Sequence, residues 1–349
     1  MPLQRRSCDG SDVSRPASGH RRRTALAKRG SSGAEAPVVR AESLSKRFGG
    51  VVAVDDLSFE LEQSTITGFL GPNGAGKTTT LRMLLGLAKP SSGRAFIFGQ
   101  PYAELAEPSR QVGAVLEATD FHPGRSGRDH LRMLAEAVDL PRSRVEEVLR
   151  LVELQEAARR RVKTYSLGMR QRLGLATALL GDPELLILDE PANGLDPEGM
   201  RWMRGLLREF ADRGGTVLLS SHLLREVEAV ADQLVIIGGG KIVASGSREE
   251  LMAKAGTVVR ATDAEALESA LIYAALKPRS DSNGGFVVDA EPRAVGAAAL
   301  AGGVVLTHLA AAQDAGLEQL FFDLTSGGAE NGAEPRDRVE ASDEVEANR

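Results

Sequence analysis

Residues Ile66 to Thr78 read Ile-Thr-Gly-Phe-Leu-Gly-Pro-Asn-Gly-Ala-Gly-Lys-Thr, an apolar run that passes into a glycine-rich segment. The second part fits the spacing G-x-x-x-x-G-K-[ST], and a helical pattern of leucines follows from Leu81. A glycine-rich loop between a strand and a helix turns backbone N–H groups inward around an anion, and the helix N-terminus adds its dipole. We therefore predict a phosphate-binding loop, in which Lys77 reaches the β- and γ-phosphates and the Thr78 hydroxyl binds Mg²⁺.

The residues predicted to contact the phosphates lie in this loop and at the start of the helix. They are Gly71, Pro72, Asn73, Gly74, Ala75, Gly76, Lys77, Thr78 and Thr79. The alternative is a glycine-rich loop with an accidental lysine, and the order of strand, loop and helix disfavours it.

A second apolar run, Leu185 to Leu188, ends in the two carboxylates Asp189 and Glu190. Unbroken apolar runs of this length are typical of strands buried on both faces of a parallel sheet. The end of such a strand beside the phosphate loop is where an α/β sheet exposes its ligand crevice. We expect Asp189 to hold Mg²⁺ and Glu190 to polarise the attacking water. Taken alone, the two acids fit equally well as an N-cap pair at a strand-to-helix turn.

A third apolar run, Val217 to Leu219, ends in Ser220, Ser221 and His222. Its polar end is predicted to deliver the imidazole of His222 to the same edge of the sheet, where the ring can hydrogen-bond the γ-phosphate. The alternative is a surface histidine or one satisfied by neighbouring groups.

Composition sets limits on the class of protein. A length of 349 residues indicates about two domains, and 42 % hydrophobic with 26 % charged residues is ordinary for a soluble globular protein. A single cysteine, Cys8, excludes an intrachain disulfide and a cysteine-built zinc site. The net charge of −5 disfavours a protein devoted to nucleic acid, so we expect no nucleic-acid partner.

The chain is predicted to carry two tails around two domains. Residues 1–37 hold eight Arg or Lys and three acidic residues, residues 327–349 hold three Arg and seven acidic residues, and neither shows apolar periodicity. Both are predicted to be disordered. No transmembrane helix is expected, because the best candidate, residues 294–312, is rich in Ala and Gly and fits a helix, a turn and a buried strand.

The remaining elements follow from apolar patterning. Short strands are predicted over residues 38–41, 51–54 and 57–61, and residues 100–165 are predicted to be mainly helical. A hairpin is predicted from Leu234–Ile237 and Ile242–Ala244. From residue 257 to 325 strands and helices alternate on a smaller scale, which indicates an α+β accessory domain over 257–326.

With these motifs in order, the chain resembles the nucleotide-binding subunits of ATP-binding-cassette (ABC) transporters over about residues 38–250. The segment that separates this family from other phosphate-loop ATPases is here Tyr165-Ser-Leu-Gly-Met-Arg-Gln-Arg172. The resemblance implies that the Ser166 hydroxyl and the Gly168 N–H bind the γ-phosphate of ATP held by an opposite subunit. Two positions depart from the pattern, with Leu167 where the family commonly has Gly and Met169 where it has Gln.

The resemblance assigns roles to three further residues. Phe48, 23 positions before Gly71, matches the aromatic that stacks on adenine, with a core phenylalanine as the alternative. Asp196 ends a loop, Asn193–Asp196, by which one subunit senses the active site of the other. Glu117 stands where many members carry the glutamine that links Mg²⁺ and water to the helical subdomain, so a metal-binding role is expected for it.

The resemblance also implies the partners. Phe121–Arg125 is the candidate groove for a coupling helix of a membrane permease, with a solvent-exposed loop as an equal alternative. Leu317–Thr325 resembles the end of the C-terminal domain of drug-resistance-type exporter ATPases, which favours export over import.

The implied fold is α/β, a P-loop NTPase cassette with a RecA-like parallel sheet core, an antiparallel β subdomain and a helical subdomain at about 100–165, plus a small C-terminal α+β domain. The implied function is an ATPase subunit that uses ATP and Mg²⁺, pairs head to tail with a second copy and energises a separate permease. It would act at the cytoplasmic face of the membrane, exporting drugs or other small hydrophobic compounds. The alternatives are an importer ATPase and a non-transport ABC ATPase that acts as a regulatory switch.

Overall fold

The computed structural model describes residues 36–116, 121–248, 250–251, 256–281 and 284–311. Four expectations therefore fall outside the described residues. They are the basic tail apart from its last two residues, the acidic tail, the metal-binding role of Glu117 and the segment Leu317–Thr325.

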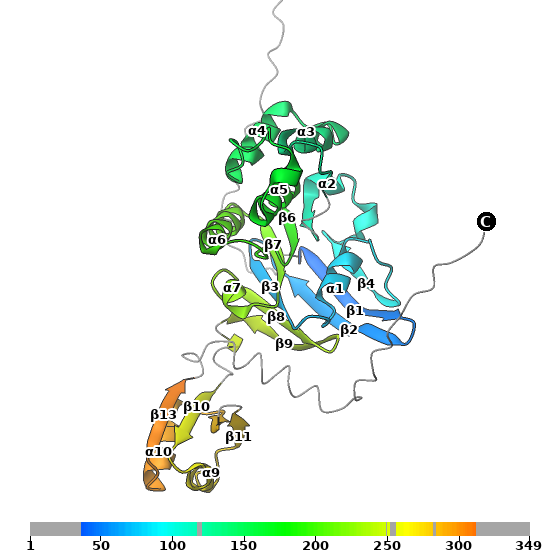
Figure 1. The fold of residues 1–349 in the computed structure, drawn as a ribbon. Coiled ribbons are helices and arrows are strands. Elements are labelled where there is room, and N and C mark those ends of the chain that lie inside the picture. Colours follow the sequence, from blue (N-terminus) through cyan, green and yellow to red (C-terminus); the bar gives the residue numbers. More distant parts are fainter. Residues whose placement is uncertain (1–35, 117–120, 249, 252–255, 282–283, 312–349) are drawn as a thin grey trace, which may run out of the picture. The chain divides into compact units, whose positions relative to one another are not determined.

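A six-stranded sheet forms the centre of the cassette, and its strand order is β5-β6-β7-β3-β8-β9 (Figure 1). Neighbouring strands are parallel except for the β8–β9 hairpin, which is antiparallel as predicted. The strands are β3 (Ile66–Leu70), β5 (Val112–Val115), β6 (Leu185–Asp189), β7 (Thr216–Ser221), β8 (Gln233–Gly238) and β9 (Lys241–Ser247). The apolar runs that predicted β3, β6 and β7 are buried along their whole length.

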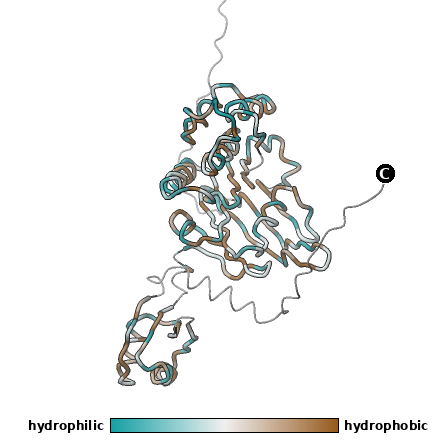
Figure 2. The backbone as a smooth tube through the Cα atoms, in the orientation of Figure 1, coloured by the Kyte–Doolittle hydropathy of each residue, from teal (hydrophilic) through white to brown (hydrophobic). Residues whose placement is uncertain are grey.

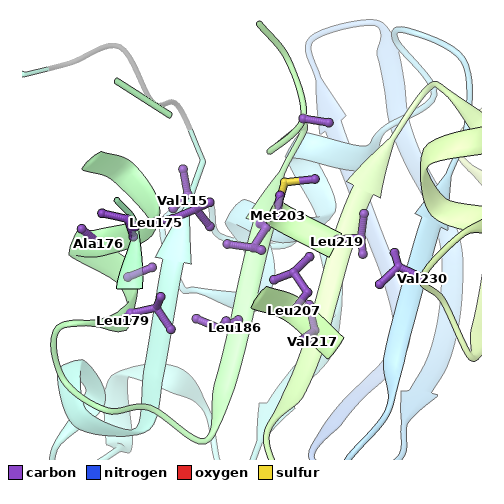
Figure 3. Close-up of a cluster of buried hydrophobic side chains, with 14 of the residues drawn as sticks. Val115, Leu175, Ala176, Leu179, Leu186, Met203, Leu207, Val217, Leu219 and Val230 are labelled. Atoms are coloured by element: carbon purple, nitrogen blue, oxygen red, sulfur yellow. The ribbon is translucent and has the colours of Figure 1, made fainter. Parts of the chain in front are cut away.

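Both faces of this sheet are packed, which explains why its strands do not alternate with polar residues. Along β6, Leu185 and Ile187 belong to one hydrophobic core, and Leu186 and Leu188 belong to the other. In the hydropathy view, hydrophobic segments follow the central strands (Figure 2). Neighbouring strands and the helices on that face contribute the side chains of the core around Leu186 (Figure 3).

Each core has its own set of elements. The core that includes Leu185 contains α1 (Lys77–Leu84) and a three-stranded antiparallel sheet of β1 (Val39–Phe48), β2 (Val51–Leu61) and β4 (Ser92–Ile97). The core that includes Leu186 contains the helices of the opposite face. These are α3 (Gly127–Ala137), α4 (Arg142–Leu151), α5 (Leu167–Leu179), α6 (Pro197–Asp212) and α7 (Leu224–Glu228).

One prediction of local structure in the cassette was wrong, and one short strand was missed. Residues 51–54 and 57–61 are not separate strands, because Asp55 and Asp56 form a bulge inside one strand, β2, with Asp56 at φ 53°. The stretch 100–165 is helical over α3 and α4 but also contains a short helix, α2 (Pro108–Gln111), and the edge strand β5. Four residues carry too little periodicity to predict such a strand.

The C-terminal domain has the order β10 (Thr257–Ala261), α9 (Ala264–Tyr273), β11 (Pro278–Asp281), β12 (Gly285–Val288), α10 (Pro292–Ala301) and β13 (Leu306–Ala311). Its antiparallel sheet, β11-β12-β10-β13, has the split β-α-β topology of ferredoxin-like domains. The helix and turn predicted within 294–312 are present. The predicted buried strand is wrong, because β13 is at the sheet edge and Leu309 is 38 % exposed.

The helices in the described part of the chain are all too short or too polar to cross a bilayer.

Candidate functional site

The phosphate loop connects β3 to α1, as the sequence predicts. Gly74 and Gly76 adopt left-handed backbone conformations, with φ 83° and 102°, which glycine tolerates. A Cβ on Gly76 would lie 2.5 Å from the carbonyl oxygen of Ala53, so a side chain does not fit there. Gly76 is also the N-cap of α1 and offers no side-chain cap, so the first N–H groups of the helix are left for an anion.

Lys77 lies across this loop and is only 6 % exposed. Its ammonium donates to the carbonyl oxygens of Gly71, at 2.8 Å, and Pro72, at 3.3 Å. The same Nζ lies 3.4 Å from Oε1 of Glu190. A cavity of about 210 Å³ opens here, lined by Ala53, Asn73, Gly74, Gly76, Lys77, Thr78, Thr79 and Glu190.

Thr78 and Asp189 meet although they are 111 residues apart. Oγ1 of Thr78 donates to Oδ2 of Asp189 at 2.6 Å, and the Ser220 hydroxyl donates to the other carboxylate oxygen. Ser220 stands opposite Asp189 because β6 and β7 pair in parallel. Ser220 was not among the predicted site residues, although a serine directly after the apolar run of β7 is a usable signal.

The donor set fits Mg²⁺. A threonine hydroxyl and a carboxylate are hard oxygen ligands of the kind that Mg²⁺ prefers, usually together with phosphate and water. Within the residues that the structure describes, no group of three or more His, Cys, Asp or Glu side chains could hold a metal ion. Mg²⁺ bound to Thr78 and Asp189 would therefore need phosphate and water as further ligands.

Glu190 directs its two carboxylate oxygens to two different side chains. Oε1 faces Lys77, and Oε2 accepts a hydrogen bond from Nδ1 of His222 at 2.8 Å. The backbone of Glu190 has φ 48°, and its N–H donates to the Ser220 hydroxyl at 3.0 Å. Strained backbone of this kind is concentrated at functional sites. The N-cap alternative is wrong, because the next helix, α6, is capped by Asp196.

Glu226 on α7 is a further acidic residue that the sequence analysis did not identify. Its carboxylate lies 3.3 Å from the Ser221 hydroxyl. Burial raises the pKa of Glu226, the hydrogen bond from Ser221 opposes this, and the charge of Glu190 raises the pKa further. No motif marks this residue, and its only signal is its position four residues after His222.

Ser166 and Gly168 lie at the start of α5. Ser166 is the N-cap, with its Oγ accepting from the Met169 N–H at 3.2 Å, and it is exposed. Asp196 caps α6 in the same way, accepting from the Gly199 N–H at 2.8 Å. The described residues that line the phosphate cavity include none of these three, so one chain does not bring them to its own phosphate loop.

Phe48 is 55 % exposed at the end of β1, so the alternative of a core phenylalanine is wrong. Lys46 Nζ lies 4.9 Å from the centre of its ring. The adenine-stacking role stays a prediction.

Phe121, at the start of the candidate partner groove, is partly buried and packs edge-on against His130, with ring centres 5.0 Å apart. Burial and the charge of Arg125 lower the pKa of His130. The segment is therefore anchored at one end, and its role as a groove stays a prediction.

Comparison with known proteins gives consistent matches. Residues 54–193 match the family model described as ABC transporter. Over 209 residues, the chain is 45 % identical to an uncharacterized ABC transporter ATP-binding protein, YhcH, of Bacillus subtilis, covering 59 % of this chain and 68 % of the relative. Over the same length and shares, it is 44 % identical to the bacitracin transport ATP-binding protein BcrA of Bacillus licheniformis.

A solved structure shares the fold. It is the dimeric ATP-binding cassette MJ0796 in a post-hydrolysis state bound to ADP and Pi, with a TM-score of 0.55 and 21 % identity. The match covers 60 % of this chain and 98 % of that one.

Proposed function

Because the chain belongs to the family of ABC transporter ATP-binding proteins, we propose that two copies of this ATP-hydrolysing subunit close head to tail around two Mg-ATP molecules and drive a separate permease. The observation that carries the proposal is the meeting of distant motifs at one cavity. Thr78 lies 2.6 Å from Asp189, and Lys77 lies 3.4 Å from Glu190.

The chain's own residues divide the work of phosphoryl transfer. The loop N–H groups and Lys77 bind the phosphates and neutralise charge on the γ-phosphate, and Thr78 and Asp189 would hold the Mg²⁺. A bound Mg²⁺ supplies charge stabilisation at the phosphate oxygens. Glu190 borders the cavity and orients the attacking water, and the hydrogen bond from His222 fixes the direction of its carboxylate.

The second copy completes the site. Ser166 is exposed at the start of α5, outside the cavity of its own chain, and a helix N-terminus attracts anions. We expect this end, with the Ser166 hydroxyl and the Gly168 N–H, to cover the γ-phosphate bound by the other copy. The dimeric state of the cassette MJ0796 supports this arrangement.

The permease would hold the subunit at the cytoplasmic face of the membrane, with Phe121–Arg125 as the contact segment. A drug or other small hydrophobic compound is the proposed cargo, which the relative named for bacitracin transport supports, and export is the proposed direction. The complete Asp189 and Glu190 pair supports an ATPase over a switch that only binds ATP.

The test replaces the residue that orients water. Glu190→Gln keeps the shape of the side chain but removes the carboxylate, so ATP binding should persist while turnover falls by about 10²-fold or more. Phosphate release and size-exclusion chromatography with Mg-ATP should show a stable nucleotide-bound dimer. Turnover near that of the wild type would overturn the role of Glu190, and a monomer at saturating ATP would overturn the paired arrangement.

A further inference from the structure

Leu167, the first residue of α5, lies directly on Gly194 in the loop that follows β6. A Cβ on Gly194 would collide with the Cδ2 and Cγ atoms of Leu167 and would lie 3.2 Å from its Cβ. Gly194 has φ 79°, and Leu167 is 42 % exposed. The leucine side chain therefore occupies the space that the glycine leaves open.

Two more contacts attach the first turn of α5 to the same loop. A Cβ on Gly168 would lie 3.3 Å from the Gly194 carbonyl oxygen and 3.5 Å from Cδ2 of Leu195. One turn later, the buried Gln171 donates from Nε2 to the Asn193 carbonyl oxygen at 2.9 Å. The start of α5 is thus held to residues 193–195 by both apolar packing and a hydrogen bond.

The next residue of α5 extends the connection to α6. The Arg172 guanidinium stacks over the ring of Trp202, with its Cζ 4.1 Å from the ring centre. It also forms an ion pair with Glu153 and donates to the Val152 carbonyl oxygen at 3.3 Å. The stacking on Trp202 therefore joins α5 to α6, and the contacts with Glu153 and Val152 join α5 to the end of α4.

The loop itself starts at the catalytic acid. The Asn193 N–H donates to the Glu190 carbonyl oxygen at 3.1 Å, and the Leu195 N–H donates to that of Ala192 at 3.0 Å. These hydrogen bonds link the backbone of Glu190 to the loop that contains Gly194, on which Leu167 lies. Ser166, the neighbour of Leu167, is exposed at the helix end.

We infer that Leu167 is a positioning residue that couples hydrolysis at a chain's own ATP to its contact with the ATP of the other copy. The inference rests on the proposed function, because only in the head-to-tail pair do Glu190 and Ser166 of one chain act on different nucleotides. Leu167 touches neither nucleotide in this account. It fixes the helix end relative to the loop of Glu190, so that the two sites change together.

The test uses the full chain and steady-state ATP hydrolysis over a range of ATP concentrations. Leu167→Ala should lower kcat by about 3- to 20-fold and reduce the Hill coefficient to about 1, because the coupling contact is lost. Its affinity for a fluorescent ATP analogue and its Tm should match the wild type. Leu167→Met should retain cooperativity, and the control Leu87→Ala, an exposed leucine after α1, should change nothing.

A second pair of variants tests the contact itself. Gly194→Ala places a methyl group against Leu167 and should lower kcat, and adding Leu167→Ala should restore part of the loss because the collision is removed. An unchanged kcat and Hill coefficient in Leu167→Ala, a wild-type Hill coefficient of about 1, or a Gly194→Ala defect that Leu167→Ala does not relieve would each overturn the inference. A wild-type chain that releases no phosphate would overturn the proposed function, and the inference with it.

Discussion

Two regions are proposed to bind phosphate, and they differ in how their polar groups are paired. The first, the strand edge, comprises Lys77 and the residues at the carboxyl ends of β6 and β7, and the second, the helix end, is the start of α5 at Ser166. At the strand edge, Lys77 contacts two carbonyl oxygens and Glu190, and Asp189 accepts from two hydroxyls. At the helix end, the Ser166 hydroxyl caps its own helix and the residue is exposed. The first region is organised by contacts within one chain, and the second is positioned by packing and faces outward.

This difference predicts two classes of variant. Changes to the groups at the strand edge that bind phosphate or Mg²⁺, such as Lys77, should alter nucleotide binding by a single chain. Changes at the helix end should leave binding by a single chain intact and affect only the paired state. The distinction between the two regions would be wrong if both classes of variant changed ATP affinity and kcat in the same way.

The largest effect is expected for Lys77→Ala. The variant removes the charge that faces the phosphates and leaves Glu190 without its cation, so kcat/KM should fall by about 10²- to 10³-fold and ATP affinity should fall with it. Titration with a fluorescent ATP analogue and phosphate release measure the two losses. The control is Lys241→Ala, an exposed lysine paired with Asp55 on β2. Unaltered ATP affinity in Lys77→Ala would contradict the claim that the strand edge binds nucleotide within a single chain.

A smaller effect, confined to turnover, is expected for Ser166→Ala. The loss of one hydrogen bond to a charged group should lower kcat by about 10-fold, with single-chain ATP affinity unchanged. The matched control is Ser126→Ala, which removes the N-cap of α3, where Ser126 accepts from the Asp129 N–H at 3.1 Å. Both variants should lose about 1 kcal/mol of stability, measured by denaturant unfolding. Equal turnover in the two variants would show that Ser166 only caps its helix.

The strand edge was predictable from sequence because its residues follow apolar runs. The carboxyl ends of parallel strands meet at one edge, so Asp189, Glu190 and His222 could be placed together before their distances were known. The contact of Leu167 with Gly194 could not be predicted, because it depends on how α5 packs against a loop 27 positions later. Glu226 was missed because burial, and not a motif, distinguishes it.

The same limits explain the errors in the fold. Asp55 and Asp56 interrupt the apolar pattern between the two predicted strands, but the long β1–β2 pairing accommodates them as a bulge. β5 has the short run Val-Gly-Ala-Val, and Gly113 is required there because a Cβ would collide with the Ala178 carbonyl oxygen of α5. That requirement comes from tertiary packing, which a window of four residues does not contain.

The smallest effect is expected for Glu226, and it tests whether the charges at the strand edge are balanced within one chain. Because the pKa of Glu226 is raised on folding, the folded chain holds a proton that the unfolded chain releases, and the ionised carboxylate lowers stability. Stability should therefore rise as the pH falls through the raised pKa toward the ordinary value of 4.5, and level off below that value. Glu226→Gln removes this titration, so its Tm should exceed that of the wild type at about pH 8 and approach it at about pH 5.

The matched control is Glu156→Gln, at an exposed position outside the site. Its Tm should follow the wild type across the whole pH range. Glu190, His222 and Arg204, the charged groups that act on Glu226, are common to all three proteins, so the difference isolates the one carboxyl. If Glu226→Gln gave no pH-dependent difference, His222 and Arg204 would balance the partly buried carboxylate of Glu226, and the charges at the strand edge would be fully compensated within one chain. A difference of the expected sign would instead mean that the ionised carboxylate of Glu226 lowers the stability of the fold at this edge, in contrast to the exposed helix end at Ser166.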